Sequence, residues 1–262
     1  VSGNAELAEG NIDFRGDIVI HGNVESGVNI RATGSITIDG VAEACMLEAG
    51  KDIILRGGML GGNKASVKTK GAITAKFFEF TNILCEGDLQ ADVLMDCSVI
   101  CHGQIRLTGR KGSIIGGKVQ AIRGLIATSL GNDAEKRTEI FVGAGIDVYS
   151  RLRVMEKKIE TTREELAKIE EGLEKFEILS KERGVSYTND PRRTSLLRIK
   201  IKDSAMLASD EEEVRKLRIL AESSRGACVS VIQEIYPGVI INMDELKLAL
   251  KNMATGVEFY KL

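Results

Sequence analysis

Residues 16–22, Gly-Asp-Ile-Val-Ile-His-Gly, begin a ladder of similar segments that decides the fold. A close variant follows at residues 34–40, Gly-Ser-Ile-Thr-Ile-Asp-Gly. Shorter copies then begin at Gly50, Gly71, Gly87, Gly103 and Gly124. Most copies therefore start about 16–18 residues after the preceding one, and two start about 21 residues after it. A recurrence of this length, with short apolar alternations between glycines, is typical of a solenoid of stacked β-coils.

Each copy alternates between side chains that would point inward and side chains that would point outward. Ile18 and Ile20 would share one face of a strand, and so would Ile36 and Ile38 in the next copy. Glycine at each corner indicates either a positive φ or an approach of the backbone that excludes a Cβ atom. The pattern predicts a parallel β-helix with coils of about 16–18 residues.

Glycine content divides the chain of 262 residues into two regions. Of its 28 glycines, 23 precede residue 146, whereas the charged segment 151–225 contains only Gly172 and Gly184. We therefore expect a β-helix domain made of residues 1–147 and 226–262, in which the second segment caps or completes the stack. Residues 148–225 are expected to form an inserted helical hairpin.

From Val148 onward the apolar residues recur at alternating steps of three and four, the a/d pattern of a coiled coil. They are Leu152, Met155, Ile159, Thr162, Leu166, Ile169, Leu173 and Phe176. Turn-forming residues at 184–190 end this helix, and Asp190 is expected to cap a second helix that starts with Pro191.

The second helix is expected to reach about Ser223. Its apolar positions include Leu197, Ile201, Leu207, Val214, Leu217 and Leu220. The pattern is less regular at residues 203–210, where the helix could break. Similar helix lengths and a short turn predict an antiparallel α-helical coiled-coil hairpin, whose narrow apolar seams could pair with another copy. Residues 151–183 carry nine basic and nine acidic side chains, which does not suit a polybasic lipid-binding or nucleic-acid-binding arm.

After Gly226 the strand pattern returns. Tyr236-Pro237-Gly238 predicts a turn between two strands. Residues 244–253 are expected to form a short helix and residues 257–260 a last strand. These segments would cap one end of the stack, because solenoids must cover their terminal edges.

Charge and hydropathy exclude several classes of partner. The formal net charge is −2, so no net positive field favours nucleic acid. No apolar run approaches the roughly 20 residues of a membrane-spanning helix, which argues against direct membrane insertion. No signal peptide is visible. The sequence starts with Val1 within an ongoing repeat, so we expect it to be a fragment of a longer chain.

The five cysteines do not suggest a disulfide framework or a metal site. Their number is odd and no CxxC pair occurs. Cys85 precedes Gly87 at the same offset as Cys101 precedes Gly103, so the two are expected to stack in neighbouring coils. The favoured interpretation is a buried column of small side chains in a reducing cytoplasm, with a redox pair or metal ligands as the alternative. No metal or other cofactor is expected.

Two glycine-rich stretches, residues 57–62 and 112–117, account for the longer repeat steps. We interpret both as wide corners inserted between strands. Glycine-rich loops can cradle phosphate. Neither stretch continues as a P-loop or opens a βαβ unit, so both nucleotide-binding patterns fail.

The aromatic cluster at residues 75–80 supplies candidate contact residues for a protein partner. Phe77 and Phe78 are neighbours, so both cannot point inward from a strand. Either one of them caps the core at a corner, or one is exposed to a partner. The candidate partner-binding residues are Phe77, Phe78 and Phe80, together with Leu166, Ile169, Leu173 and Phe176 of the predicted hairpin.

The ordered motifs resemble a family. Residues 10–22, the Gly-Gly-Met-Leu-Gly-Gly stretch, Ala-Lys-Phe-Phe-Glu at 75–79, Gly-Ser-Ile-Ile-Gly-Gly at 112–117 and Tyr-Pro-Gly-Val at 236–239 resemble the C-terminal region of flagellar assembly protein A (FapA). The resemblance implies a right-handed β-helix with a coiled-coil insertion, a preceding N-terminal domain, and a cytoplasmic, non-enzymatic role, for example in placing flagellar components. The β-helix is similar in kind to those of bactofilins and of the MinC C-terminal domain, which self-associate.

Three classes of function come into question for such a sequence. The first is a non-enzymatic scaffold for self-association or protein–protein interaction in flagellar assembly or polar placement. The alternative is a left-handed hexapeptide acyltransferase, because apolar residues recur every six positions from Ile12 to Ile36. That register is lost by Ala42, and no histidine is expected beside an acidic partner on a protruding loop. A carbohydrate-cleaving β-helix would need aligned carboxylates, and none follow Asp88 and Asp92.

Overall fold

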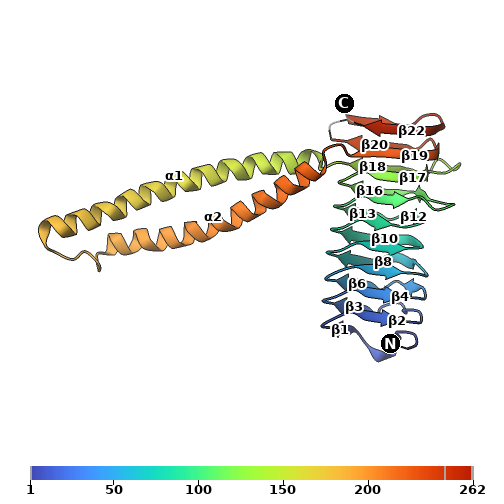
Figure 1. Cartoon of the computed structure of the whole chain (residues 1–262), viewed down its shortest axis with the longest axis horizontal. Helices are drawn as coiled ribbons and strands as arrows, with labels where there is room; N and C mark the ends of the chain where they lie inside the picture. The colour runs from blue at the N-terminus through green and yellow to red at the C-terminus, as the bar shows by residue number, and fades with distance from the viewer. Residues whose placement is uncertain (1, 245, 261–262) are drawn as a thin grey trace. The chain divides into compact units, whose positions relative to one another are not determined.

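A computed structural model describes residues 2–244 and 246–260. The chain divides into two compact units, Val1–Gly145 with Ser223–Leu262, and Ile146–Glu222. The first unit is a parallel β-solenoid, whose rungs are stacked from β1 to β20 in Figure 1. The second unit consists of two long helices.

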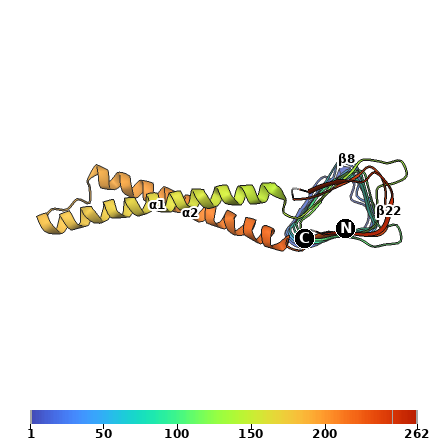
Figure 2. The same cartoon turned by 90° about the horizontal axis from the view of Figure 1, so that it is seen from above.

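The solenoid has three faces, which Figure 2 shows as the three sides seen along its axis. The strands of the first face are β1 (Ile12–Phe14), β3 (Asn29–Ala32), β6 (Met46–Ala49), β13 (Ser98–Cys101), β16 (Gly117–Ala121), β18 (Thr138–Val142) and β20 (Val239–Met243). Those of the second face are β2 (Ile18–Ile20), β4 (Ile36–Ile38), β7 (Ile53–Leu55), β9 (Ile73–Ala75), β11 (Leu89–Gln90) and β14 (Ile105–Leu107). Equivalent strands of successive coils pair in parallel, so Ile18 lies in register with Ile36.

The third face is built from shorter segments. Its separate strands are β5 (Ala42–Glu43), β12 (Val93–Met95) and β15 (Ser113–Ile115). Longer strands bend around a corner and serve two faces: β8 (Met59–Thr69), β10 (Phe77–Cys85), β17 (Leu125–Leu130) and β19 (Cys228–Ile235). A 3₁₀ turn at Leu7–Glu9 precedes β1.

The core is a continuous column of aliphatic side chains inside the solenoid. Alternation at period two directs Ile18 and Ile20 inward, as predicted, and leaves Val19 exposed. Ile36, Ile38 and their equivalents in later coils continue the column with essentially no exposure. Burial of this apolar surface is the main force that holds the coils together.

Asparagine and aspartate side chains satisfy the backbone at the corners. Asp17 Oδ1 accepts the N–H of Ser35 at 2.7 Å, one coil further along the chain. The same arrangement joins Asn23 to Val41, Asp52 to Ala72 and Asp88 to Gln104. A Cβ atom at Gly34 would lie 2.0 Å from Asp17 Oδ1, and one at Gly103 would lie 2.3 Å from Asp88 Oδ1. At these two corners, close approach rather than positive φ explains the glycine.

The glycine-rich stretches only partly match the inserted corners that the sequence predicts, because each stretch also holds a regular rung of the third face. Met59 and Leu60 pair with Ala42 and Glu43, so the first stretch holds a regular rung of the third face. The second stretch holds β15 in the same way. The extra residues lie at the corner next to each rung: between Leu60 and Ser66 within β8, and between Arg106 and Ser113 before β15. The longer repeat steps therefore come from inserted corner residues, as predicted.

After the helical unit the chain continues the stack, because β19 pairs with β17 and β20 pairs with β18. The turn predicted at 236–238 is confirmed between β19 and β20. The helix predicted at 244–253 is wrong: β21 (Leu246–Ala249) pairs antiparallel with β20. The last strand, β22 (Ala254–Tyr260), pairs antiparallel with β19. Pairing with the exposed edge of the last coil outweighs the local helical pattern.

The helices are α1 (Gly145–Arg183) and α2 (Pro191–Ser223). Asp190 Oδ1 accepts the N–H of Arg192 at 2.8 Å, which confirms the predicted N-cap. α2 is continuous through residues 203–210, so the break that the pattern allowed there does not occur. No described helix is both long enough and apolar enough to cross a membrane.

Candidate interaction surfaces

Ion pairs join the two helices across their antiparallel register. Arg218 donates to Glu156 at 2.6 Å, and Arg163 donates to Glu211 at 2.5 Å. Both pairs join residues of α1 and α2 that are far apart in sequence. They lie beside the apolar seam, where flanking charges select the orientation of coiled-coil helices.

Further pairs bring polar side chains of α2 into the seam itself. Lys158 Nζ lies 2.7 Å from Asp210 Oδ2, and Lys200 Nζ lies 2.7 Å from Glu170 Oε1. Asp210 is largely buried, with 13% of its side chain exposed. The helix positions that face α1 are therefore only partly apolar, and they follow Lys200, Asp203, Leu207, Asp210, Val214 and Leu217 at steps of three and four.

This register corrects one predicted apolar position. Ile201 is 71% exposed, whereas Val214 and Leu217 are buried as expected. Leu197, Leu207 and Leu220 are half-buried. The physical reason is that Lys200 and its neighbours occupy the positions next to α1, where they meet the charges of that helix. Ile201 follows Lys200 directly and so lies on another face.

The four candidate contact residues of α1 lie on the predicted seam. Leu166, Ile169, Leu173 and Phe176 are all half-buried. At the tip, the ring centroids of Phe176 and Tyr187 are 6.2 Å apart. The guanidinium carbon of Arg192 lies 6.0 Å from the centroid of the Phe176 ring. Phe176 therefore packs within the hairpin. The other three residues remain incompletely covered.

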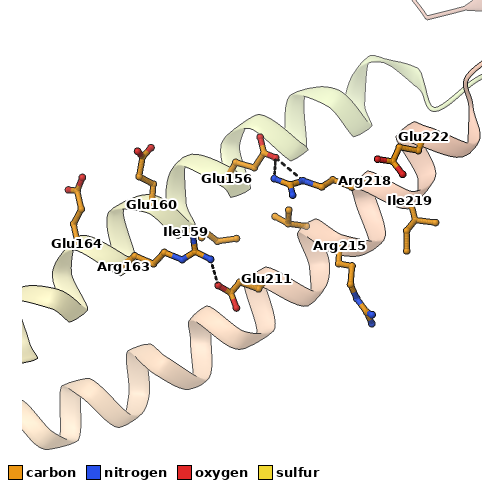
Figure 3. Close-up of a pocket in the computed structure, with 11 residues that line it drawn as sticks. Glu156, Ile159, Glu160, Arg163, Glu164, Glu211, Arg215, Arg218, Ile219 and Glu222 are labelled. Carbon is orange, nitrogen blue, oxygen red and sulfur yellow. Dashed lines mark hydrogen bonds and ion pairs between the residues drawn. The ribbon is translucent and has the colours of Figure 1, made fainter.

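A groove runs between the two helices (Figure 3). Its volume is about 980 Å³, and its lining includes the aliphatic side chains of Ile159 and Val214. Figure 3 shows the Glu156–Arg218 and Arg163–Glu211 pairs extending between the helices. Ile159 and Val214 are themselves buried, so the groove is a surface depression between the helices that is bordered mainly by charged side chains.

The phenylalanine cluster divides as the sequence predicted. Phe78 is completely buried in the solenoid core, so it is not part of the surface. Phe77 points outward and is half-buried against Gly58, where a Cβ atom would lie 2.5 Å from the Phe77 ring. Phe80, also half-buried, has a φ of 47° at the bend of β10. Phe77 and Phe80 are therefore the members of this cluster that a partner could reach.

Neighbouring coils extend the apolar character of Phe77 along the third face. Phe77 lies in register with Val93, and Met95 lies in register with Ile115. Val93, Met95 and Ile115 are half-buried, and Leu60 is 42% exposed. We call Leu60, Phe77, Val93, Met95 and Ile115 the third-face patch. Glu79 lies in register between Leu60 and Met95, so one carboxylate interrupts this apolar surface on its rigid support.

The cysteine column belongs to the core. Cys85 pairs in register with Cys101, which confirms the expected stacking, and both are fully buried. The hydrogen bond with Cys85 and burial raise the pKa of Cys101, and burial raises the pKa of Cys45 to about 12 and that of Cys97 to about 11. These thiols are poor nucleophiles because the thiolate is the reactive form. The described residues hold no group of three metal-ligating side chains.

One histidine has an acidic partner that the sequence did not predict. His21 Nδ1 lies 2.8 Å from Asp39 Oδ2, and Arg56 Nε lies 3.3 Å from Asp39 Oδ1. The His21 side chain is 64% exposed. These residues occupy equivalent corners of successive coils, so the contacts form a charge ladder along the surface. The signal for it was the repeat itself, which places positions 21, 39 and 56 directly after equivalent strands.

Sequence reasoning also missed a second face of α2. Eight residues recur at steps of three and four outside the seam, and all are exposed except Glu212, which is half-buried. Three of them, Arg215, Ile219 and Glu222, also border the groove of Figure 3. We call them the α2 stripe: Arg198, Ile201, Ala205, Ala208, Glu212, Arg215, Ile219 and Glu222. Figure 3 shows Arg215 pointing away from α1. The same helical period that revealed the α1 seam was present here, but charged residues dilute it.

Comparison with known proteins places these surfaces in context. The family model described as Flagellar Assembly Protein A beta solenoid domain matches residues 1–261. No curated protein and no solved structure shows significant similarity to the chain.

Proposed function

The chain belongs to the FapA β-solenoid family, and we propose that it is a non-enzymatic scaffold that binds protein partners and copies of itself through its helical hairpin. The solenoid supplies a rigid support, and the hairpin supplies the contact surface. The proposed place of action is the cytoplasm, in the assembly or polar placement of flagellar components. Five free thiols suit a reducing compartment.

The incomplete seam of the hairpin carries this proposal. An isolated pair of helices gains most of its stability from a closed apolar seam. In this hairpin Lys200, Asp203 and Asp210 occupy positions that face α1, while Leu166 and Ile169 of α1 stay half-buried. Apolar surface left open in this way is suited to a further helix, as in helix-in-groove recognition.

The third-face patch supports a second contact of the scaffold. Phe77 and Leu60 stand on strands that are hydrogen-bonded on both sides, so the patch needs no ordering when it binds. Phe80 lies at the neighbouring bend. An aromatic side chain on such a support resembles the anchors that dominate protein interfaces.

An acyltransferase is the alternative function. Its best support is the His21–Asp39 contact, since an acid–histidine pair can activate a nucleophile. The exposure of His21 at a corner argues for the scaffold, because catalysis of this kind needs a substrate held in a cleft. Arg56 also shares the Asp39 carboxylate, which fits a surface charge ladder.

The mass in solution tests the proposal. Light scattering would compare the intact chain with a variant in which a short Gly-Ser linker replaces residues 148–222, and circular dichroism would check that the variant keeps its β-structure. We expect an oligomer for the intact chain and a folded monomer for the variant. A monomeric intact chain would refute self-association, and an oligomeric variant would move the contact to the solenoid.

A further inference from the structure

The α2 stripe has a composition that differs from an ordinary solvated helix face. Ile201 and Ile219 are among the most exposed aliphatic side chains of the structure, at 71% and 58%. Between them lie Ala205 and Ala208, which leave room for another backbone to approach closely. Arg198 and Glu222 are exposed at the two ends of the stripe. The stripe thus has opposite charges at its two ends, and between them lie two isoleucines, two alanines and the Glu212–Arg215 ion pair.

The stripe is also self-complementary about Asp210. This position is midway in the sequence between Arg198 and Glu222, and it is also midway between Ile201 and Ile219. The inner members of the stripe are also placed symmetrically: Ala205 and Arg215 lie at equal distances from position 210, and so do Ala208 and Glu212. Two such helices placed antiparallel would therefore match arginine with glutamate at both ends and isoleucine with isoleucine further in.

The charges at the ends of the stripe are available for such a contact. No ion pair within the described residues engages Arg198 or Glu222. By contrast, Arg215 pairs with Glu212 at 2.8 Å, so the charges nearest the centre already neutralise each other. When two copies approach closely, Arg198 of each would face Glu222 of the other, so no like charges would be opposed at the ends of the stripe.

We propose that a second copy of this chain binds along the α2 stripe, with the two α2 helices antiparallel about a two-fold axis that crosses the stripe at the level of Asp210, between Ala208 and Glu212. This inference rests on the proposed self-association and assigns it to the α2 stripe, which leaves the open seam available to a helix of another protein. From Arg198 to Glu222 the contact would extend about 36 Å, at roughly 1.5 Å per residue. Such an interface is isologous and closes as a dimer.

Charge exchange tests the arrangement in the full chain. R198E would oppose two carboxylates at each end of the stripe, and E222R would oppose two guanidinium groups there. We expect each variant to weaken the dimer about tenfold by analytical ultracentrifugation at low salt. Mixing the two variants would restore the affinity, because both charge pairs are attractive in the mixed dimer. The double variant R198E/E222R would also dimerise as the original chain does.

Aliphatic substitutions test the centre of the stripe. I201D is expected to weaken the dimer by about 100-fold, since each dimer contains two such sites. I199D is the matched control, because Ile199 is 42% exposed but lies outside the stripe; it should leave the dimer unchanged. Equal helicity by circular dichroism would show that the variants still fold.

The outcomes separate this inference from the proposed function. If the hairpin deletion yields monomers while the charge exchanges and I201D leave the dimer intact, another face of the hairpin makes the contact and the α2 stripe is refuted. If charge exchange weakens the dimer but mixing does not restore it, the antiparallel arrangement is wrong. If the intact chain is monomeric, the proposed self-association itself fails.

Discussion

Asp17 Oδ1 accepts a hydrogen bond from the backbone N–H of Ser35 at 2.7 Å, although the two residues belong to different coils. The contact joins equivalent corners of successive coils. Backbone groups at a corner lack a regular strand partner, so a side-chain oxygen from the preceding coil satisfies them. The oxygen occupies the place of a Cβ atom, which explains why Gly34 precedes Ser35.

Replacement of Gly34 by alanine should therefore destabilise the solenoid. The new Cβ atom would lie 2.0 Å from Asp17 Oδ1 and 2.7 Å from the carbonyl oxygen of Gly16. We expect a loss of about 2 to 3 kcal/mol in the free energy of unfolding, measured by urea denaturation. Gly3→Ala is the control, because no atom lies within 4 Å of its added Cβ. A small effect at Gly34 would contradict the close approach.

The two neighbouring phenylalanines should respond differently to truncation. Phe78→Ala removes a fully buried ring and should lower the free energy of unfolding by about 3 to 5 kcal/mol. Phe77→Ala removes an outward ring and should cost about 1 kcal/mol or less. Thermal or urea unfolding of both variants would measure the difference. Similar losses would mean that Phe77 belongs to the core.

The buried cysteines should resist modification in the folded protein. Burial raises the pKa of Cys45 to about 12 and that of Cys97 to about 11, so both remain thiols at pH 8. With Ellman's reagent we expect at most one thiol, that of half-buried Cys228, to react in the native protein. All five should react in denaturant. Rapid reaction of two or more native thiols would disagree with the packed core.

Gly172 weakens α1, and its replacement by alanine should stabilise the hairpin. Alanine favours helix over glycine by about 1 kcal/mol, and the new Cβ atom would lie 3.3 Å from Leu196 Cδ1, the end of a flexible side chain. We expect a net gain of about 0.5 kcal/mol in thermal unfolding of the helical signal. Gly184→Ala provides the contrast: its φ of 65° disfavours a side chain, so that variant should lose stability.

The N-cap of α2 should give the hairpin a dependence on pH. The hydrogen bond from Arg192 lowers the pKa of Asp190 in the folded protein. The pKa of Asp190 in the unfolded chain is about 3.9, and above that pH the ionised carboxylate stabilises the folded hairpin. This stabilisation is lost as the pH falls through the lower pKa of the folded state. Asp190→Ala should therefore reduce helix stability at pH 7 and have less effect near pH 2. Asp190→Asn, which keeps the capping oxygen, should lose the pH dependence but retain much of the cap.

Local patterns in the sequence were sufficient to predict the solenoid and the presence of two helices. The period-two alternation of Ile18 and Ile20 and the seam from Leu152 to Phe176 each depend on residues close together in the chain. The N-cap at Asp190 is equally local. Such signals act within one turn or one strand, so they can be read without knowledge of the fold.

Contacts between segments that are distant in the sequence decided how the C-terminal residues pair and which face of α2 packs against α1. Residues 246–249 carry no strong strand pattern, yet they form β21 because the edge of β20 offers backbone partners. Lys158 and Glu170 on α1 bring Asp210 and Lys200 of α2 toward the seam, which turns Ile201 outward and creates the exposed α2 stripe. The helical period of α2 allows several faces to pack. The charges of α1, placed opposite by the antiparallel turn, and the burial of Val214 and Leu217 together select among them.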